Sequence, residues 1–214
     1  MKSLVVAQEK PKAVKKPVSY RSYLMDGIRV IGNSASALNE IYGKIDENET
    51  TLANQKKSGW ERLKELLRQM IGREAEERLI DLQYMDPVKA VPVRIRLNYH
   101  QFRADMEKRI RLLSSISVQG SATAKLDAMS EEQLIALLEK TVREVQSLHR
   151  TLSALDEFHK AEAPKELREK IKGIRPELAT VKNSFVKANQ LRHEYSARLE
   201  EEEQMKKLGI TPNA

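Results

Sequence analysis

The sequence contains no cysteine, few aromatic residues and no long apolar run. Without cysteine, neither a disulfide framework nor a thiolate site can form, which is typical of a reducing compartment, so we expect a cytoplasmic location. Aromatic residues make up only 5% of the 214 positions, which argues against a broad aromatic core. No apolar stretch approaches the roughly 20 residues needed to cross a bilayer. The apolar run near Met1 is also too short for the core of a signal peptide.

Charged residues, in contrast, are abundant. They make up 32% of the chain beside 40% apolar residues, a balance typical of a soluble helical protein. The net charge of +7 is unevenly distributed, because residues 1–19 carry +4, residues 58–117 carry +3 and residues 131–214 carry none. A clustered excess favours nucleic acid or an anionic membrane as a partner, so only the first two segments are relevant to such binding.

Residues from Leu24 to Leu52 repeat apolar or small side chains in alternating steps of four and three, with Glu49 as the only break. This pattern predicts a helix that packs along a heptad seam. The stretch "GIRVIGNS" within it resembles a phosphate-binding loop, but Asn33 occupies the position of the essential lysine and no strand precedes it. We interpret its glycines as sites of close helix packing.

Two further seams follow near the C-terminus. Ser130 and Gln133 have the spacing of a capping box, and the helix they open continues to Pro164. Its predicted seam positions are Leu134, Leu138, Thr141, Val145, Leu148, Leu152 and Leu155. A last helix begins near Pro164, with a kink expected at Gly173 and Pro176. Because so few residues separate these helices, they are expected to lie antiparallel.

The stretch "AVPVRIRLNYHQF" differs from its helical surroundings, since its apolar residues alternate strictly with other residues. Residues 79–85 alternate in the same way, and "DPVKA" between the two runs supplies a turn. We therefore predict a β-hairpin with one apolar face, covered by the helices that precede and follow it in sequence. Asn98 and Gln101 resemble the cap of the following helix.

The run "YMDPVKAVPVRIRLNYHQF", from Tyr84 to Phe102, resembles a segment of uncharacterised helical proteins of spirochaetes. In that family, a strand ending in Asp-Pro leads through a second strand into a helix. The resemblance implies the hairpin and no activity.

Together these patterns predict a mainly α fold, with a long antiparallel helical hairpin or three-helix bundle and a small α-β-β-α unit. The expected organisation has five parts: a disordered basic tail at 1–19, a heptad helix at 20–57 packing with the C-terminal bundle, a helix-hairpin-helix unit at 58–117, a linker at 118–129 and an antiparallel helical hairpin at 130–209.

No pattern indicates catalysis. Asp156 and His159 have the spacing of half a di-iron ligand set, but the second copy that such a site needs is missing. The carboxylate clusters have no sign of an apolar pocket, so a solvated surface is the better interpretation. We therefore predict no enzyme activity, no catalytic residue, no metal site and no cofactor.

Two functions remain, and the first is a protein–protein interaction or scaffold module whose partner is another helical protein or a second copy of this chain. The candidate docking residues are Ile80, Leu82, Tyr84, Val93 and Ile95. The alternative is binding of nucleic acid by the middle segment and the N-terminal tail. Its candidate phosphate contacts are Arg94, Arg96, Arg103, Lys108 and Arg111.

Overall fold

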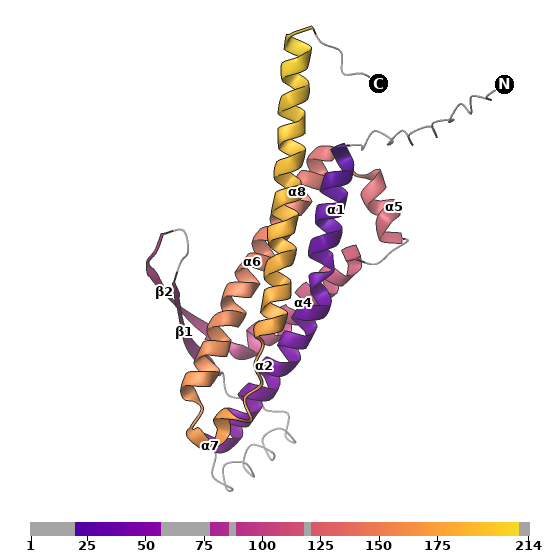
Figure 1. Ribbon diagram of the computed structural model, residues 1–214. Helices are drawn as coiled ribbons and strands as arrows, with labels where there is room; N and C mark the ends of the chain where they lie inside the picture. Colours follow the sequence, from indigo (N-terminus) through magenta and orange to yellow (C-terminus); the bar gives the residue numbers. More distant parts are fainter. Residues whose placement is uncertain (1–19, 57–77, 86–88, 118–120, 210–214) are drawn as a thin grey trace, which may run out of the picture.

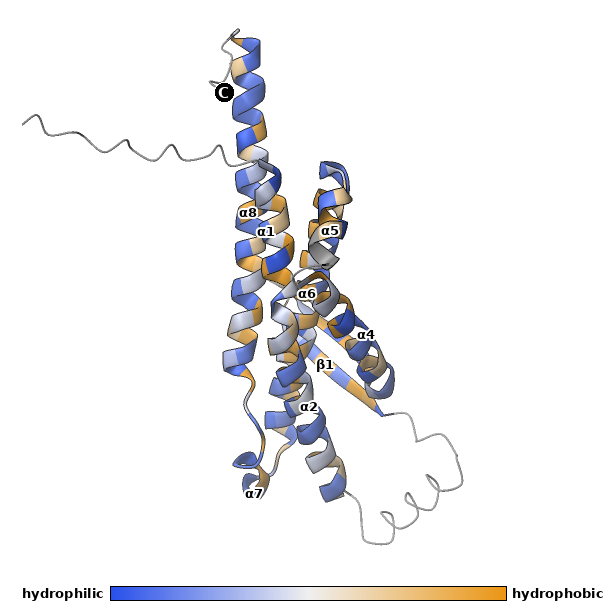
Figure 2. Cartoon of the chain, turned by 90° about the vertical axis from the view of Figure 1, so that its right-hand side faces the viewer, coloured by the Kyte–Doolittle hydropathy of each residue, from blue (hydrophilic) through white to orange (hydrophobic). Residues whose placement is uncertain are grey.

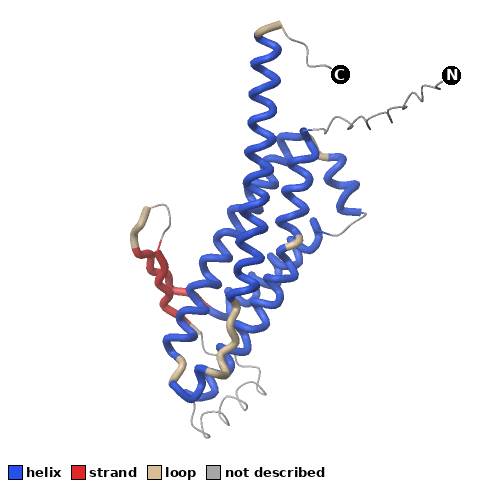
Figure 3. Tube along the Cα trace, viewed as in Figure 1, coloured by secondary structure: helices blue, strands red, loops and turns tan. Residues whose placement is uncertain are grey.

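The computed structural model describes residues 20–56, 78–85, 89–117 and 121–209 of the chain (Figure 1). Helices dominate these residues, and a small β-hairpin lies on one side of them (Figure 3). The expected mainly α fold with a hairpin is therefore confirmed. The predicted basic tail at 1–19 and the helix expected from Ser58 lie outside the described residues.

Helices α1 (Tyr20–Gly32), α6 (Glu131–Glu162) and α8 (Arg175–Lys207) form a three-helix bundle in which each contacts the other two. Apolar residues, orange in Figure 2, gather where α1 and α8 lie together. Every seam position predicted for α6 is buried. These positions are Leu134, Leu138, Thr141, Val145, Leu148, Leu152 and Leu155. Ser130 and Gln133 also form the predicted capping box at the start of α6.

The first heptad segment forms two helices rather than one, because a turn at Asn33 separates α1 from α2 (Ser34–Lys56). The interruption is slight, since the Asn33 backbone N–H still donates to the Arg29 carbonyl at 3.0 Å. The Ser34 hydroxyl donates to the Ile31 carbonyl at 2.6 Å, and such local hydrogen bonds from short polar side chains compete with helical ones. The seam is buried on both sides of the turn.

Helix α4 (Tyr99–Ser117) follows the hairpin directly and packs along α1 and α2. The predicted cap is confirmed, because the Asn98 side-chain oxygen accepts a hydrogen bond from the Gln101 backbone N–H at 3.2 Å. A further short helix, α5 (Ser121–Ala128), occupies much of the segment expected to be a linker. Arg21 of α1 donates to the carbonyl of Leu126 at 2.9 Å, so a long-range contact holds this helix in place.

The final helical segment is interrupted where only a kink was expected. Helix α7 (Lys165–Arg168) ends early, and residues 169–174 are not helical before α8 begins. Asn48 of α2 explains the interruption, because its side chain both donates to the Lys172 carbonyl at 3.0 Å and accepts from the Lys172 N–H at 2.8 Å. These bonds satisfy backbone groups that a continuous helix would otherwise pair. None of the described helices combines the length and apolar character that crossing a bilayer requires.

Candidate partner-docking site

Strands β1 (Leu79–Met85) and β2 (Pro92–Asn98) form the predicted antiparallel hairpin, which projects beside α6 (Figure 1). Successive side chains of a strand point to opposite faces. The register pairs Ile80 with Leu97, Leu82 with Ile95 and Tyr84 with Val93. The expected apolar face is therefore present.

The bundle covers only part of this apolar face. Ile80 and Leu82 on β1 retain 2% of their accessible surface, because α6 packs against that strand. Tyr84, Val93 and Ile95 are only half-buried. Of the five predicted docking residues, Ile80 and Leu82 thus lie in the core, and the other three remain partly accessible. The covering helix α6 is distant in sequence, a contact that periodicity alone could not predict.

The opposite face of the hairpin carries charge. Arg96 donates through Nε to the Asp81 side chain directly opposite, at 2.9 Å, and both side chains are exposed. This hydrogen bond raises the pKa of Arg96 above its ordinary value. Arg94 lies opposite Gln83, is exposed and forms no ion pair with any described residue. The ends of this face are apolar, since Leu79 is 47% exposed and Met85 is 63% exposed.

The remaining predicted phosphate contacts lie on α4, and two of them already have acidic partners. Arg103 donates to the Tyr42 hydroxyl at 2.9 Å and lies 3.5 Å from an Asp46 oxygen. Arg111 lies 3.8 Å from Glu107, one turn earlier on the helix. Pairing with carboxylates reduces the positive potential that these side chains offer to a phosphate.

A buried polar cluster fixes the base of the hairpin to the bundle. Arg78, immediately before β1, donates through Nε to Glu49 of α2 at 2.6 Å. The other carboxylate oxygen of Glu49 lies 3.1 Å from Nε2 of His159 on α6. Glu49 is 5% exposed and His159 is fully buried. The cluster therefore joins α2, α6 and the hairpin at one point.

Burial alone would raise the pKa of Glu49, but hydrogen bonds from His159 and Arg78 outweigh it and hold this pKa below its ordinary value. The carboxylate is therefore ionised near neutral pH and can only accept hydrogen bonds. It follows that Nε2 of His159 carries a proton. Sequence reasoning treated Glu49 as a break in the seam, although an acidic residue at a seam position was itself a signal of a buried pair.

Asp156, which was weighed with His159 as a partial metal site, pairs with Lys160 one turn later. Neither the Oδ1 atom of Asp156 nor the Nδ1 atom of His159 has a hydrogen-bond partner among the described residues. Within the same residues, no group of three or more histidine, aspartate or glutamate side chains is placed to hold a metal ion. The absence of a metal site and of catalysis stays a prediction.

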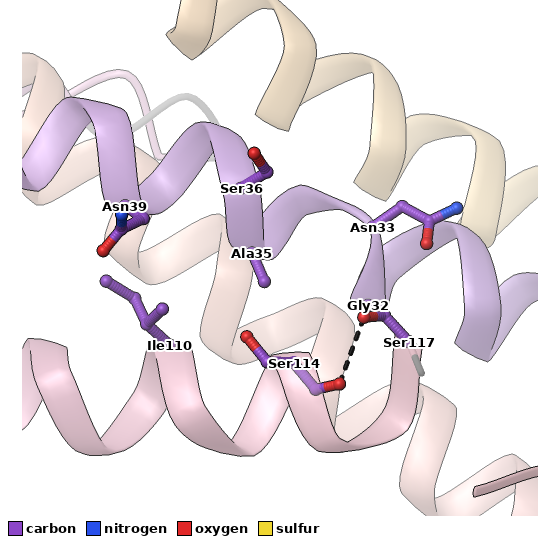
Figure 4. A pocket seen from close by; sticks show the side chains of 8 residues that line it. All are labelled: Gly32, Asn33, Ala35, Ser36, Asn39, Ile110, Ser114 and Ser117. Carbon is purple, nitrogen blue, oxygen red and sulfur yellow. Dashed lines mark hydrogen bonds between the residues drawn. The ribbon is translucent and has the colours of Figure 1, made fainter. Parts of the chain in front are cut away.

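A depression of about 570 Å³ lies between the α1–α2 turn and α4 (Figure 4). Its lining has no charged side chain. The lining residues are Gly32, Asn33, Ala35, Ser36, Asn39, Ile110, Ser114 and Ser117. A Cβ atom on Gly32 would lie 3.0 Å from the backbone nitrogen of Ser117, so this glycine permits close helix approach. The interpretation of "GIRVIGNS" as a packing element fits this geometry.

Comparison with known proteins places these features in a family. A protein family described as a C-terminal domain matches residues 21–209, nearly the whole described chain. The chain belongs to this family. An uncharacterised protein of Treponema pallidum (strain Nichols), a spirochaete, is 28% identical over 188 residues. The alignment covers 87% of this chain but only 40% of that relative. The resemblance to uncharacterised spirochaete proteins is thereby confirmed. No solved structure matches the chain.

Proposed function

We propose that this family member is a non-enzymatic protein–protein interaction module, in which the long helices form a scaffold and the hairpin docks another protein. The observation that carries the proposal is the incomplete cover of the hairpin. Six large apolar side chains are exposed among the described residues, and three of them, Leu79, Met85 and Val91, lie in or beside the hairpin. On the apolar face, Tyr84, Val93 and Ile95 are also only half-buried. An apolar face that the fold leaves partly uncovered is typical of interaction surfaces.

The anchoring of the hairpin also supports docking. A two-stranded sheet is marginally stable on its own, but α6 covers the inner part of this one and the Glu49 cluster holds its base. The outer part is therefore presented on a rigid support, which reduces the entropy lost on binding. Helical partners, including a second copy of this chain, remain proposals of the same kind.

Site-specific crosslinking tests the proposal. A photoreactive side chain replaces Val93 in the full chain, expressed in its native cells, and the control carries it at Val186, an exposed apolar residue of α8. We expect a discrete protein adduct from position 93 and none from position 186. Identical adduct patterns at both positions, or no adduct at position 93, would contradict docking by the hairpin.

The nucleic-acid alternative has less support, because Arg103 and Arg111 already face carboxylates. It is tested separately by titrating the full chain with duplex DNA and single-stranded RNA at increasing salt. Binding whose affinity falls steeply with salt would favour the alternative, and no binding at low salt would exclude it.

A further inference from the structure

The hydrogen bonds of the hairpin reveal which backbone groups face outward. The Tyr99 backbone N–H donates to the Arg78 carbonyl at 2.8 Å, and the register continued by one step makes these residues direct partners. In an antiparallel pair, hydrogen-bonded partners alternate with partners that turn their N–H and C=O groups away from each other. Leu82–Ile95 is therefore a bonded pair, and Gln83–Arg94 is an outward-facing one.

The alternation leaves two different edges. On β2, the outward groups are the N–H and C=O of Arg94 and Arg96 and the C=O of Pro92. Proline has no N–H to donate, so its presence at an outward position is consistent with this assignment. The outward groups on β1 belong to Leu79, Asp81, Gln83 and Met85.

Strand β2 is the more accessible of the two. Helix α6 packs against β1, whereas the main contacts of β2 are with β1 and with α4, which continues from its end. The burial pattern agrees, because Ile80 and Leu82 are buried while Val93 and Ile95 are half-buried. Within the described part of the chain, the edge of β2 along residues 92–96 is thus open to pairing with another strand.

Resting on the proposed docking function, we infer that the partner is an extended peptide segment in which acidic and apolar residues alternate, added as a third strand to the edge of β2. Cross-strand neighbours on one face lie close enough to interact, and opposite charges there are favourable. The acidic residues of the segment would face Arg94 and Arg96. Its apolar residues would extend the partly covered face beside Val93 and Ile95. Main-chain hydrogen bonds provide affinity in this mode of recognition, and alternate side chains provide specificity.

A second copy of this chain fits the same edge poorly. If two β2 strands paired around a twofold axis near Ile95, each Arg94 would face Arg96 of the other copy. Like charges directly opposite one another destabilise a pair of strands. The arginines therefore discriminate against self-pairing while favouring an acidic segment. The carboxylate of Asp81 uses only the Nε–H of Arg96, and a guanidinium has five N–H donors.

Peptide binding to the full chain tests the inference. The first probe is a short synthetic peptide of alternating Val and Glu, and the second has Lys in place of Glu. We expect the acidic probe to bind at least tenfold more tightly by fluorescence anisotropy, with NMR shift changes at the amides of Arg94 and Arg96. Equal affinity for the two probes, or shift changes confined to β1, would overturn the inference.

Two matched variants separate the edges. Arg94→Pro removes an outward N–H and the guanidinium charge while keeping every hydrogen bond between the two strands, and Gln83→Pro removes the corresponding outward N–H on β1. We expect Arg94→Pro to weaken acidic-probe binding at least tenfold and Gln83→Pro to change it less than twofold. Equal losses in both variants would overturn the assignment to β2.

A charge-reversal variant shows whether a loss of peptide binding is caused by misfolding. The double variant Arg94→Glu and Arg96→Glu should prefer the lysine probe by at least tenfold, which an unfolded chain would not do. If neither probe binds the native chain at millimolar concentration, the edge serves only to resist self-association and the inference fails. The crosslinking at position 93 would still decide the proposed function independently.

Discussion

Glu49 occupies a position where the heptad pattern requires an apolar side chain, and its environment shows why an acid is accommodated there. Arg78 and His159 both hydrogen-bond to its carboxylate, so each carboxylate oxygen has a partner and Arg78 compensates the charge. An unpaired buried charge is far more costly than a paired one. The ion pair between Glu49 and Arg78 therefore stabilises the chain only while both side chains are present.

Replacing Glu49 by glutamine should lower the free energy of unfolding by about 2 kcal/mol, because the part-buried Arg78 loses its compensating charge. Urea denaturation followed by circular dichroism measures the change. Glu107→Gln is the matched control, since its partner Arg111 is exposed at 3.8 Å and a change within about 0.5 kcal/mol is expected. Equal effects of the two substitutions would contradict a structural role for Glu49.

The same carboxylate predicts a pH dependence. Its pKa is lower in the folded chain than the ordinary value of 4.5, so its stabilising effect is present above that value. The effect is lost as the pH falls through the folded pKa. Urea denaturation at pH 7 and at steps below 4.5 should therefore show the native chain and Glu49→Gln converging in stability at acid pH. A difference that stays constant with pH would contradict the assignment.

Two glycines of the first helical segment allow a matched test of close packing. A methyl group on Gly32 would meet Ser117 at 3.0 Å, whereas one on Gly43 would meet nothing within 4 Å. Gly32→Ala should destabilise the chain by about 1–3 kcal/mol, and Gly43→Ala should stabilise it by up to about 1 kcal/mol through helix propensity. Thermal unfolding measures both. The same sign in both variants would show that the approach of α4 does not depend on Gly32.

Among the elements, α8 extends beyond the bundle that holds it, and its projecting end is mostly hydrophilic in Figure 2. Its buried residues end at Tyr195, whose hydroxyl donates to Glu131 at the start of α6 at 2.6 Å. Burial raises the pKa of Tyr195 to about 12, so this hydroxyl keeps its proton over the neutral range. Leu199, one turn later, is half-buried against the core, and α8 leaves its neighbours beyond it.

Hydrogen exchange should therefore divide α8 into two parts. Amides between Leu178 and Tyr195 should exchange near the rate set by global unfolding, whereas those after Leu199 should exchange at least a hundredfold faster. Mass spectrometry of peptides from the exchanged full chain measures the difference. Uniform protection along α8 would show that another surface covers its end, which would itself identify an interface.

The whole molecule is elongated, because the long helices lie side by side (Figure 1). Helix α8 has 33 residues, so it is about 50 Å long. A compact chain of this length would have a radius of gyration of about 17 Å. Most of the buried apolar residues nevertheless form one continuous cluster that includes α4 and the hairpin. The shape is therefore a rod with a small lateral projection.

Small-angle X-ray scattering with light scattering tests the shape. We expect a radius of gyration clearly above 17 Å for a species of 24.5 kDa, the mass of one chain. A radius near 17 Å at that mass would contradict the rod, because it would require the helices to fold back on one another.

Periodicity was sufficient for most of the elements, although not for α5, which lies in the segment expected to be a linker. The seam of α6, the capping box at Ser130 and the two faces of the hairpin all follow from spacing, because helices and strands place side chains at fixed intervals. The interruptions between the helices could not be predicted from spacing. The break before α8 depends on Asn48 reaching Lys172, a contact between distant segments that no local pattern records.

The amino-acid sequence by itself thus determined the class of fold, the helix faces and the two faces of the hairpin, since these depend on local geometry and on the burial of apolar side chains. Only the tertiary structure decided that α6 covers β1 rather than β2, and that Glu49 joins His159 and Arg78. Those contacts depend on how whole helices pack against one another in three dimensions, and local periodicity does not record such packing. The accessible edge of β2 exists for the same reason.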